Sequence, residues 1–298
     1  MTYSIVARDP ATGAFGVGVQ SHFFGVGPVV PWVQAGVGVI ATQAAANVSF
    51  GPIGLELLRS GRSADEVIAA LVASDAGEAE RQVAVVDREG RAAAHTGARC
   101  IPAAGHKIGA GFSVQGNLLR ADTVWPAMAD AFEATLALTF SERLLAALDA
   151  AEAAGGDVRG RQSAALVIVD AATASAPWAG RLLDVRVDDH RDPLPELRRL
   201  AATSEAYRLM GELDAPTDDR RPVEDRYAEA RRMAPDAMEL VFWRGIEIAT
   251  AGDLKAARAE LAVAFAADPT WRDALRHVAR AGLVGDDPGV VDRLLVDD

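Results

Sequence analysis

The sequence has one cysteine and no long uncharged apolar segment, and each of these absences excludes a class of protein. Cys100 is the only cysteine among 298 residues, which excludes an internal disulfide framework and fits a reducing compartment. No charge-free apolar run reaches the ~18–20 residues that a membrane-spanning helix needs. The first residues lack the basic and apolar regions of a secretory signal peptide. We therefore expect a cytoplasmic protein without a membrane partner.

Positive charge is also scarce, because 30 Lys and Arg residues face 42 Asp and Glu residues, for a formal net charge of −12. No basic stripe is present that would bind a phosphate backbone, so we expect no nucleic-acid partner. Residues 188–192 (DDHRD) are interpreted as a solvated loop, because no second cluster has ligand spacing. We accordingly predict no metal and no cofactor.

Apolar residues make up half of the chain, which is enough for a large core. They alternate with period two over residues 3–8 and 14–20, around a turn at residues 9–13, which predicts a hairpin. Further strands are predicted at residues 36–42, 82–87, 91–96, 112–116, 164–170 and 183–187, and helices at residues 52–60, 63–74, 121–134, 139–154 and 195–213. This order lacks the strict alternation of a doubly wound sheet. It predicts an α+β domain over residues 1–213, in which two antiparallel sheets stack between helices as a four-layer αββα sandwich.

Residues 214–222 have the composition of a linker, and residues 223–298 are predicted to be all helical. Three positions recur 34 residues later, at the spacing of a tetratricopeptide unit. These positions are Tyr227, Ala230 and Pro235, matched by Leu261, Ala264 and Pro269. A stable solenoid needs about three repeats, and this segment has fewer. We therefore expect the module to lean on its neighbour or on a second chain, and the protein to form a homo-oligomer.

The segment Gly36–Ala41 (GVGVIA) matches a dinucleotide-binding fingerprint, but its context does not. The fingerprint needs its glycines in the turn between a strand and a helix. Here Gly36 and Gly38 belong to an apolar, strand-like run. We interpret them as positions where another backbone or sheet approaches closely.

Thr2 directly follows Met1 and opens the first predicted strand. A small second residue permits removal of Met1, which would leave an α-amine and a hydroxyl on one residue. That pair is a self-contained nucleophile and base, because an amine with a pKa of about 7.7–8.0 is partly neutral near pH 7. The alternative is that Thr2 is an ordinary first residue of a strand.

Polar residues gather at the ends of several predicted strands, which indicates that those ends converge on a cleft. Ser21 and His22, Gln43 and Asn47, Gln115 to Asn117, and Arg161 to Ser163 form these groups. Residues expected to contact a substrate are Ser4, Gln43, Asn47, Gln115, Gly116, Arg161 and Ser163.

Four of these positions carry specific hypotheses. His22 is the histidine placed to reach a nucleophile on the first strand, or else a structural group. Asn117 donates to an oxyanion, or else caps a turn. Arg161 binds a substrate carboxylate, or else pairs with an internal acid. Ser4 shares a face with Thr2, so it is either a second candidate nucleophile or a neighbour that binds the Thr2 amine.

Several segments, in this order, resemble a bacterial family called domain of unknown function 1028. They are TYSIVARD (2–9), GVQSH (18–22), AGVG (35–38), ATQ (41–43), GLELL (54–58), VQGN (114–117), GGDVRGRQSAAL (155–166) and VDDH (187–190). The likeness covers about residues 1–210. That family is grouped with the N-terminal-nucleophile hydrolases, so the resemblance implies an αββα sandwich, amide-bond hydrolysis and Thr2 as the nucleophile. The C-terminal helices resemble an appended module labelled peptidoglycan-binding, whereas their spacing indicates a tetratricopeptide-like unit.

The expected function is therefore hydrolysis of a small amide, non-peptide or cyclic, by Thr2 with its own amine as base. The alternative is a non-catalytic scaffold whose helical repeat binds a protein, a peptide or a cell-wall partner.

Overall fold

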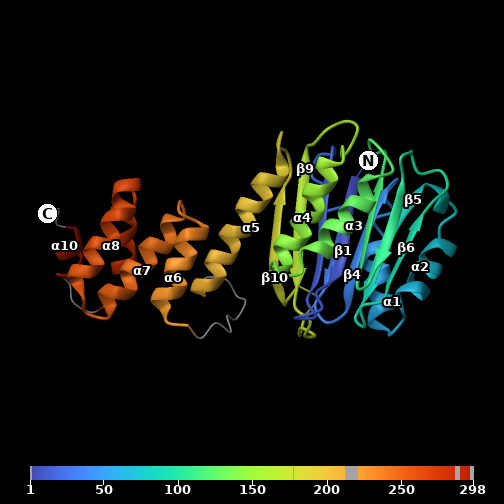
Figure 1. The fold of residues 1–298 in the computed structure, drawn as a ribbon. Coiled ribbons are helices and arrows are strands. Elements are labelled where there is room, and N and C mark those ends of the chain that lie inside the picture. The colour runs from blue at the N-terminus through green and yellow to red at the C-terminus, as the bar shows by residue number, and fades with distance from the viewer. Residues whose placement is uncertain (1, 177, 212–220, 286–288, 296–298) are drawn as a thin grey trace. The chain divides into compact units, whose positions relative to one another are not determined.

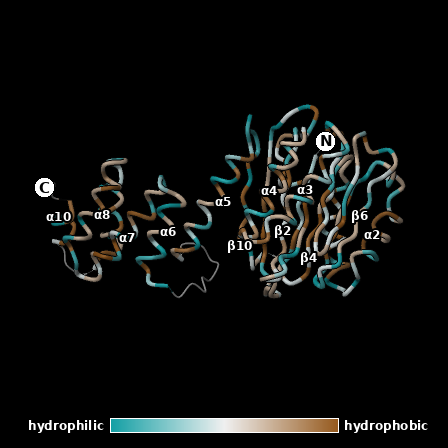
Figure 2. The backbone as a smooth tube through the Cα atoms, viewed as in Figure 1, coloured by the Kyte–Doolittle hydropathy of each residue, from teal (hydrophilic) through white to brown (hydrophobic). Residues whose placement is uncertain are grey.

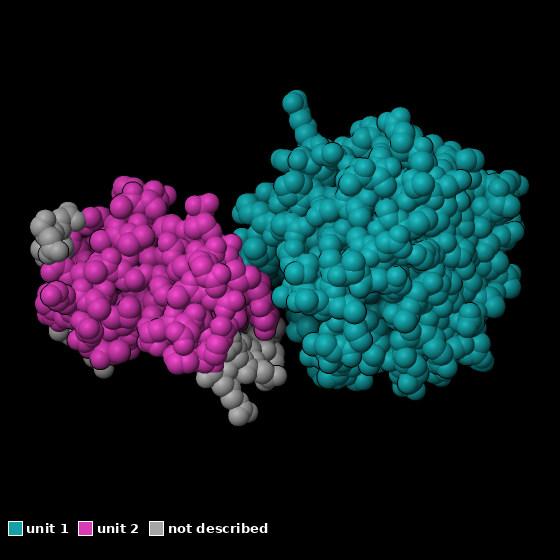
Figure 3. Space-filling model, in the orientation of Figure 1, with its two compact units in different colours: residues 1–204 teal, residues 205–298 magenta. Residues whose placement is uncertain are grey.

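The computed structural model describes residues 2–176, 178–211, 221–285 and 289–295. The chain divides into two compact units, residues 1–204 and 205–298 (Figure 3). The strands of the first unit pair antiparallel in two sheets, which confirms the mixed α+β class and the antiparallel sheets.

The large sheet has the strand order β10-β9-β2-β1-β8-β7, and the small sheet has the order β3-β4-β5-β6. The strands are β1 Thr2–Arg8, β2 Phe15–Ser21, β3 Pro31–Gln34, β4 Gly38–Ala44, β5 Arg81–Asp87, β6 Ala92–Thr96, β7 Gly105–Gly109, β8 Phe112–Asn117, β9 Ser163–Val169 and β10 Arg181–Val187. β1 is thus an inner strand, paired with β2 on one side and with β8 on the other.

The side chains of β1 alternate between two apolar cores. Tyr3, Ile5 and Ala7 belong to the core that α3 (Val124–Ala134) and α4 (Phe140–Ala153) help to build on the outer face of the large sheet. Val6 instead belongs to a valine-rich core shared with residues of the small sheet. Since the strand period is two, Thr2 lies on the same face as Val6, toward the small sheet.

The opposite face of the small sheet is covered by α1 (Phe50–Arg59) and α2 (Ala64–Ala73), on the other side of the unit from α3 and α4 (Figure 1). The predicted capping box at the start of α2 is confirmed. The Ser63 side chain accepts a hydrogen bond from the Glu66 backbone N–H, and the Glu66 carboxylate accepts one from the Ser63 N–H. Hydrophobic segments run along the strands of this unit (Figure 2), as expected for sheets buried on both faces.

The helix α5 (Pro193–Met210) spans the division between the units. Leu194 and Leu197 belong to the first unit's core, whereas Ala206 packs with residues of the second unit. The predicted domain end at residue 213 and most of the predicted linker at residues 214–222 lie outside the described residues.

The second unit is all helical within the residues described. Its helices are α6 Val223–Met233, α7 Met238–Thr250, α8 Leu254–Ala267, α9 Trp271–Arg280 and α10 Val290–Leu295. Across the described parts of both units, each helix is too short or too polar to cross a membrane.

Candidate active site at the start of the first strand

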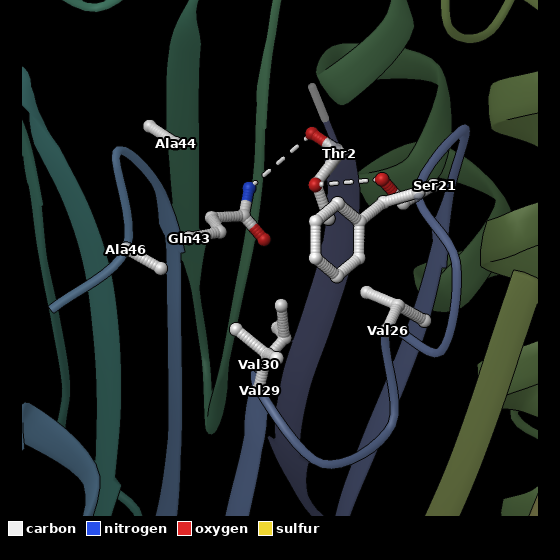
Figure 4. A pocket seen from close by; sticks show the side chains of 9 residues that line it. Thr2, Ser21, Val26, Val29, Val30, Gln43, Ala44 and Ala46 are labelled. Carbon is white, nitrogen blue, oxygen red and sulfur yellow. Dashed lines mark hydrogen bonds between the residues drawn. The ribbon is translucent and has the colours of Figure 1, made fainter. Parts of the chain in front are cut away.

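A pocket of about 270 Å³ lies beside Thr2, at the first residue of β1 (Figure 4). It is lined by Thr2, Ser21, Phe23, Val26, Val29, Val30, Gln43, Ala44 and Ala46. Thr2 and Ser21 come from neighbouring strands of the large sheet, and Gln43 comes from β4 of the small sheet. The Thr2 Oγ1 and Ser21 Oγ atoms are 3.1 Å apart. Thr2 is 5 % exposed, so the pocket is the place where a small molecule would meet this hydroxyl.

Gln43 ties the first strand to the small sheet. Its Nε2 donates to the Thr2 carbonyl oxygen at 3.3 Å and to Gln82 Oε1 at 2.8 Å, and its Oε1 accepts from Ser4 Oγ at 2.7 Å. A glutamine amide carries two N–H donors. Both are used here, so Gln43 fixes the position of the Thr2 backbone and has no further donor to offer a ligand.

Gln82, the second residue of β5, is the centre of the polar network, and the sequence analysis did not identify it as a site residue. It is fully buried, and its Oε1 accepts from both Gln43 and Asn117, the latter at 2.9 Å. Its Nε2 donates to the carbonyl oxygen of Gly116 at 2.8 Å and also contacts Thr96 Oγ1 at 3.0 Å. Gln82 thereby holds the Gln43 and Asn117 amides in fixed positions.

Asn117 ends β8 and is the direct register partner of Thr2 across the β1–β8 pair. Directly opposed residues in an antiparallel pair share one face of the sheet. The bond to Gln82 uses one of the two N–H donors on Asn117 Nδ2. The other N–H donor of Asn117 is not used by Gln82.

A second pocket, of about 420 Å³, adjoins the first. It is lined by Ala44, Ala45, Glu80, Arg99, Cys100, Ile101 and Asn117. Ala44 lines both pockets, and its φ of 67° lies in the left-handed region that alanine rarely adopts. Leu118, directly after Asn117, also has a positive φ, of 52°. Such backbone strain concentrates at functional sites.

Ser4 and Gln115 lie beneath the site and do not line either pocket. Both are fully buried, and Gln115 Nε2 donates to Ser4 Oγ at 2.6 Å. Ser4 in turn donates to Gln43, so these residues support Gln43 from the interior. Gly116 contributes a carbonyl acceptor to Gln82.

Ser163 and Asn47 fix the segments around the pocket. Ser163 Oγ donates to the Phe23 carbonyl oxygen at 2.5 Å and accepts from the Val26 N–H at 3.1 Å, which anchors the segment that supplies much of the pocket wall. Asn47 Nδ2 donates to Asp75 Oδ2 at 2.9 Å and does not line the pocket.

The structure does not bring His22 or Arg161 to the pocket. The His22 backbone N–H donates to Asp157, and its ring Nδ1 is buried with no hydrogen-bond partner among the described residues. Arg161 donates to Glu152 and Asp192, each at 2.5 Å. These ion pairs match the alternative expected for Arg161, in which it pairs with internal acids and does not bind a substrate carboxylate. Within the described ranges, no three His, Cys, Asp or Glu side chains are grouped to hold a metal ion.

The region matched by a family model agrees with the extent of the first unit, residues 1–204. A family model described as a family of unknown function (DUF1028) matches residues 2–197, so the chain belongs to that family. The crystal structure of protein SPO2555 from Silicibacter pomeroyi, of the same family, is similar, with 36 % sequence identity and a TM-score of 0.60. The match covers 67 % of this chain and 84 % of that chain. No curated protein matches the sequence.

Proposed function

We propose that this protein hydrolyses a small amide, with Thr2 as an N-terminal nucleophile once Met1 is removed. We also propose that residues 1–204 form a four-layer αββα sandwich of the N-terminal-nucleophile type. The separate apolar cores support that layering, because α1 and α2 pack on the small sheet and α3 and α4 on the large sheet. A third core joins the two sheets to each other.

The observation that carries the proposed function is the position of Thr2. It is the first residue of an inner strand, its hydroxyl lies 3.1 Å from Ser21 Oγ, and it lines a pocket. An N-terminal threonine supplies both a nucleophile and an amine base. The Gln43 contact to the Thr2 carbonyl oxygen holds that residue in place, which is the preorganisation that such chemistry needs.

The reaction proceeds in two balanced steps. Thr2 Oγ1 bonds to the amide carbonyl carbon while its proton passes to the Thr2 amine, and that proton then moves to the leaving nitrogen as the C–N bond breaks. The amine product leaves and the acyl group stays on Thr2 as an ester. Water next bonds to the same carbon, the ester C–O bond breaks, and Thr2 recovers its proton. The net reaction converts an amide and water into a carboxylic acid and an amine.

Asn117 is the proposed oxyanion donor, since its second amide N–H is not used by Gln82. One such donor is worth about 3 kcal/mol of barrier, so Asn117→Ala should lower kcat by roughly 10²–10³. KM should change much less, because the interaction strengthens in the transition state. A variant that keeps the wild-type kcat would refute this role.

The proposal is tested by intact mass and by Thr2→Val, which removes the hydroxyl while keeping the shape of the side chain. The mass of the purified native chain should show the loss of one methionine. Against a library of small and cyclic amides, the wild-type protein should show turnover that Thr2→Val lacks. Equal turnover by both proteins would exclude Thr2 as the nucleophile, and an absence of turnover by either protein would favour the scaffold as the rival function.

For residues 223–298 we propose tetratricopeptide-like helix pairs. Close packing of α7 on α8 supports this, because a Cβ on Gly245 would lie 2.7 Å from Leu261 Cγ. We propose a protein or peptide partner for these helices, and a homo-oligomeric chain. Light scattering on the full-length protein tests the oligomer, since a mass equal to one chain would exclude it.

A further inference from the structure

The two pockets beside Thr2 differ in chemistry, and this difference bears on the substrate. The first has no Asp, Glu, Lys or Arg in its lining, whereas the second includes Glu80 and Arg99. Ala44 lines both pockets, and the register partners Thr2 and Asn117 each line one of them. The two pockets therefore meet at the pair formed by Thr2 and Asn117.

We propose, on the basis of the proposed hydrolase function, that the substrate is an amide with an uncharged, apolar acyl group. That group binds in the first pocket, here named the acyl pocket. The nitrogen side of the substrate binds in the second, here named the amine pocket.

The order of the two chemical steps decides which pocket binds the acyl side of the substrate and which binds the amine side. The acyl carbon stays bonded to Thr2 through both steps, so the acyl group needs the pocket that Thr2 itself lines. The amine departs after the first step, so its pocket only has to adjoin Thr2. Glu80 and Arg99 are 51 % and 63 % exposed, which places charged groups along a solvent-accessible route for a polar product.

The walls of the acyl pocket are apolar and preformed. Val26 and Val30 are at most 2 % exposed, so packing in the core fixes their positions. Ser163 anchors the segment from Phe23 to Val26 through two hydrogen bonds. Phe23 is 50 % exposed although it lines the pocket, which places it at the mouth.

The volume limits the size of the acyl group. About 270 Å³ lies just below the ~300–1,000 Å³ range of pockets that enclose drug-sized ligands. A short aliphatic chain fits this space better than a peptide. A carboxylate placed here would lose its hydration, and no Lys or Arg side chain lines the pocket to pair with it.

The test is kcat/KM for the p-nitroanilides of acetic, butanoic, hexanoic and succinic acid, with the Met1-free full-length protein. Each buried methylene is worth about fourfold, which corresponds to ~0.8 kcal/mol, so kcat/KM should rise from acetyl to hexanoyl. The succinyl anilide, with a carboxylate where the butanoyl anilide has a methyl group, should react about 100-fold more slowly or worse.

Two neighbouring alanines provide a matched pair of variants, because Ala46 lines the acyl pocket and Ala45 lines the amine pocket. Ala46→Leu should reduce the hexanoyl-to-acetyl ratio of kcat/KM at least tenfold by filling the acyl pocket. Ala45→Leu should leave that ratio within about twofold of wild type. If Ala46→Leu does not fold, as judged by its thermal midpoint, the wild-type series alone decides.

Labelling with p-nitrophenyl acetate separates the two proposals. A flat series, or succinyl reacting as fast as butanoyl, overturns the substrate class. The same holds if Thr2 takes up acetyl from this ester while no anilide is turned over. If Thr2 takes up no acetyl and no turnover depends on Thr2, the hydrolase function itself is overturned.

Discussion

Gln82→Met provides a strict test of the polar network that holds the site together. Methionine is unbranched and has nearly the same length as glutamine, so the substitution removes hydrogen bonds without opening a large cavity. In the wild type, Gln82 Oε1 accepts from the Gln43 and Asn117 amides, and its Nε2 donates to the Gly116 carbonyl oxygen. All of these groups are buried between the sheets.

The expected loss follows from which groups keep a partner. Gln43 Nε2 retains the Thr2 carbonyl oxygen, whereas the Asn117 N–H that faced Gln82 is stranded in a buried position. A stranded buried donor costs about 1–3 kcal/mol, and each further hydrogen bond lost costs about 0.5–1.5 kcal/mol. The total is about 3 kcal/mol, which lowers the thermal midpoint of a unit of this size by roughly 6–12 °C.

The assay is differential scanning calorimetry, with Gln162→Met as the matched control. Gln162 donates to Asp189 in an exposed pair, so the same substitution there should change stability by no more than about 0.5 kcal/mol. A Gln82→Met midpoint within about 2 °C of the wild type would show that the network contributes little, and would refute this account of how Asn117 is positioned.

Three further predictions concern groups around the site. Burial, and to a lesser degree the charge of His95, lowers the pKa of His106 below its ordinary value. The neutral imidazole therefore contributes stability that is present above about pH 6.5 and is lost as pH falls through the folded-state pKa. The thermal midpoint should be lower at about pH 5.5 than at about pH 7.5, and His106→Gln should reduce this difference. Burial raises the pKa of the Cys100 thiol, so iodoacetamide should alkylate it more slowly in the folded protein than in urea, and equal rates would contradict its burial. Ala44→Gly should raise stability by about 1 kcal/mol because it relieves a left-handed alanine, whereas Ala45→Gly should not; a lower midpoint for Ala44→Gly would contradict that strain.

Much of the secondary structure was predictable because apolar residues recur every second position in strands and about every 3.6 positions in helices. The predicted helix at residues 63–74 is α2, at Ala64–Ala73, with its capping box in place. The strands β3 (PWVQ) and β7 (GHKIG) at sheet edges were missed, since a proline begins the first and glycines begin and end the second, and these residues are typical of turns. Short edge strands are recognised from their partners, which a single sequence does not reveal.

The glycines of the GVGVIA segment lie where another backbone approaches closely, as predicted, but Gly36 is in the turn before β4 and not in the strand-like run predicted for it. A Cβ on Gly36 would lie 2.5 Å from the Thr173 Cα atom, and one on Gly38 would lie 2.6 Å from the Val86 carbonyl oxygen. Both positions also have positive φ. Their role in close backbone approach was readable because the residues that follow form a strand, β4, and not a helix.

The candidate site was only partly predictable. Thr2, Gln43 and Asn117 were identified as polar residues at strand ends, and the structure joins all three through Gln82 or directly. Gln82 itself looks like one polar residue beginning an apolar strand, because its partners lie 14 to 39 residues away. The sequence showed no sign of which acids pair with Arg161, since Asp192 reaches it from 31 positions away.

The most direct test of the central claim is peptide mapping of the Met1-free protein after brief reaction with p-nitrophenyl acetate and an acid quench. The account predicts that the acetyl mass appears on the peptide that begins at Thr2, as an ester that hydroxylamine removes, and that Thr2→Val carries none. Acetyl found instead on Ser4, Ser21 or Cys100, or on no N-terminal peptide while amide turnover continues, would contradict it.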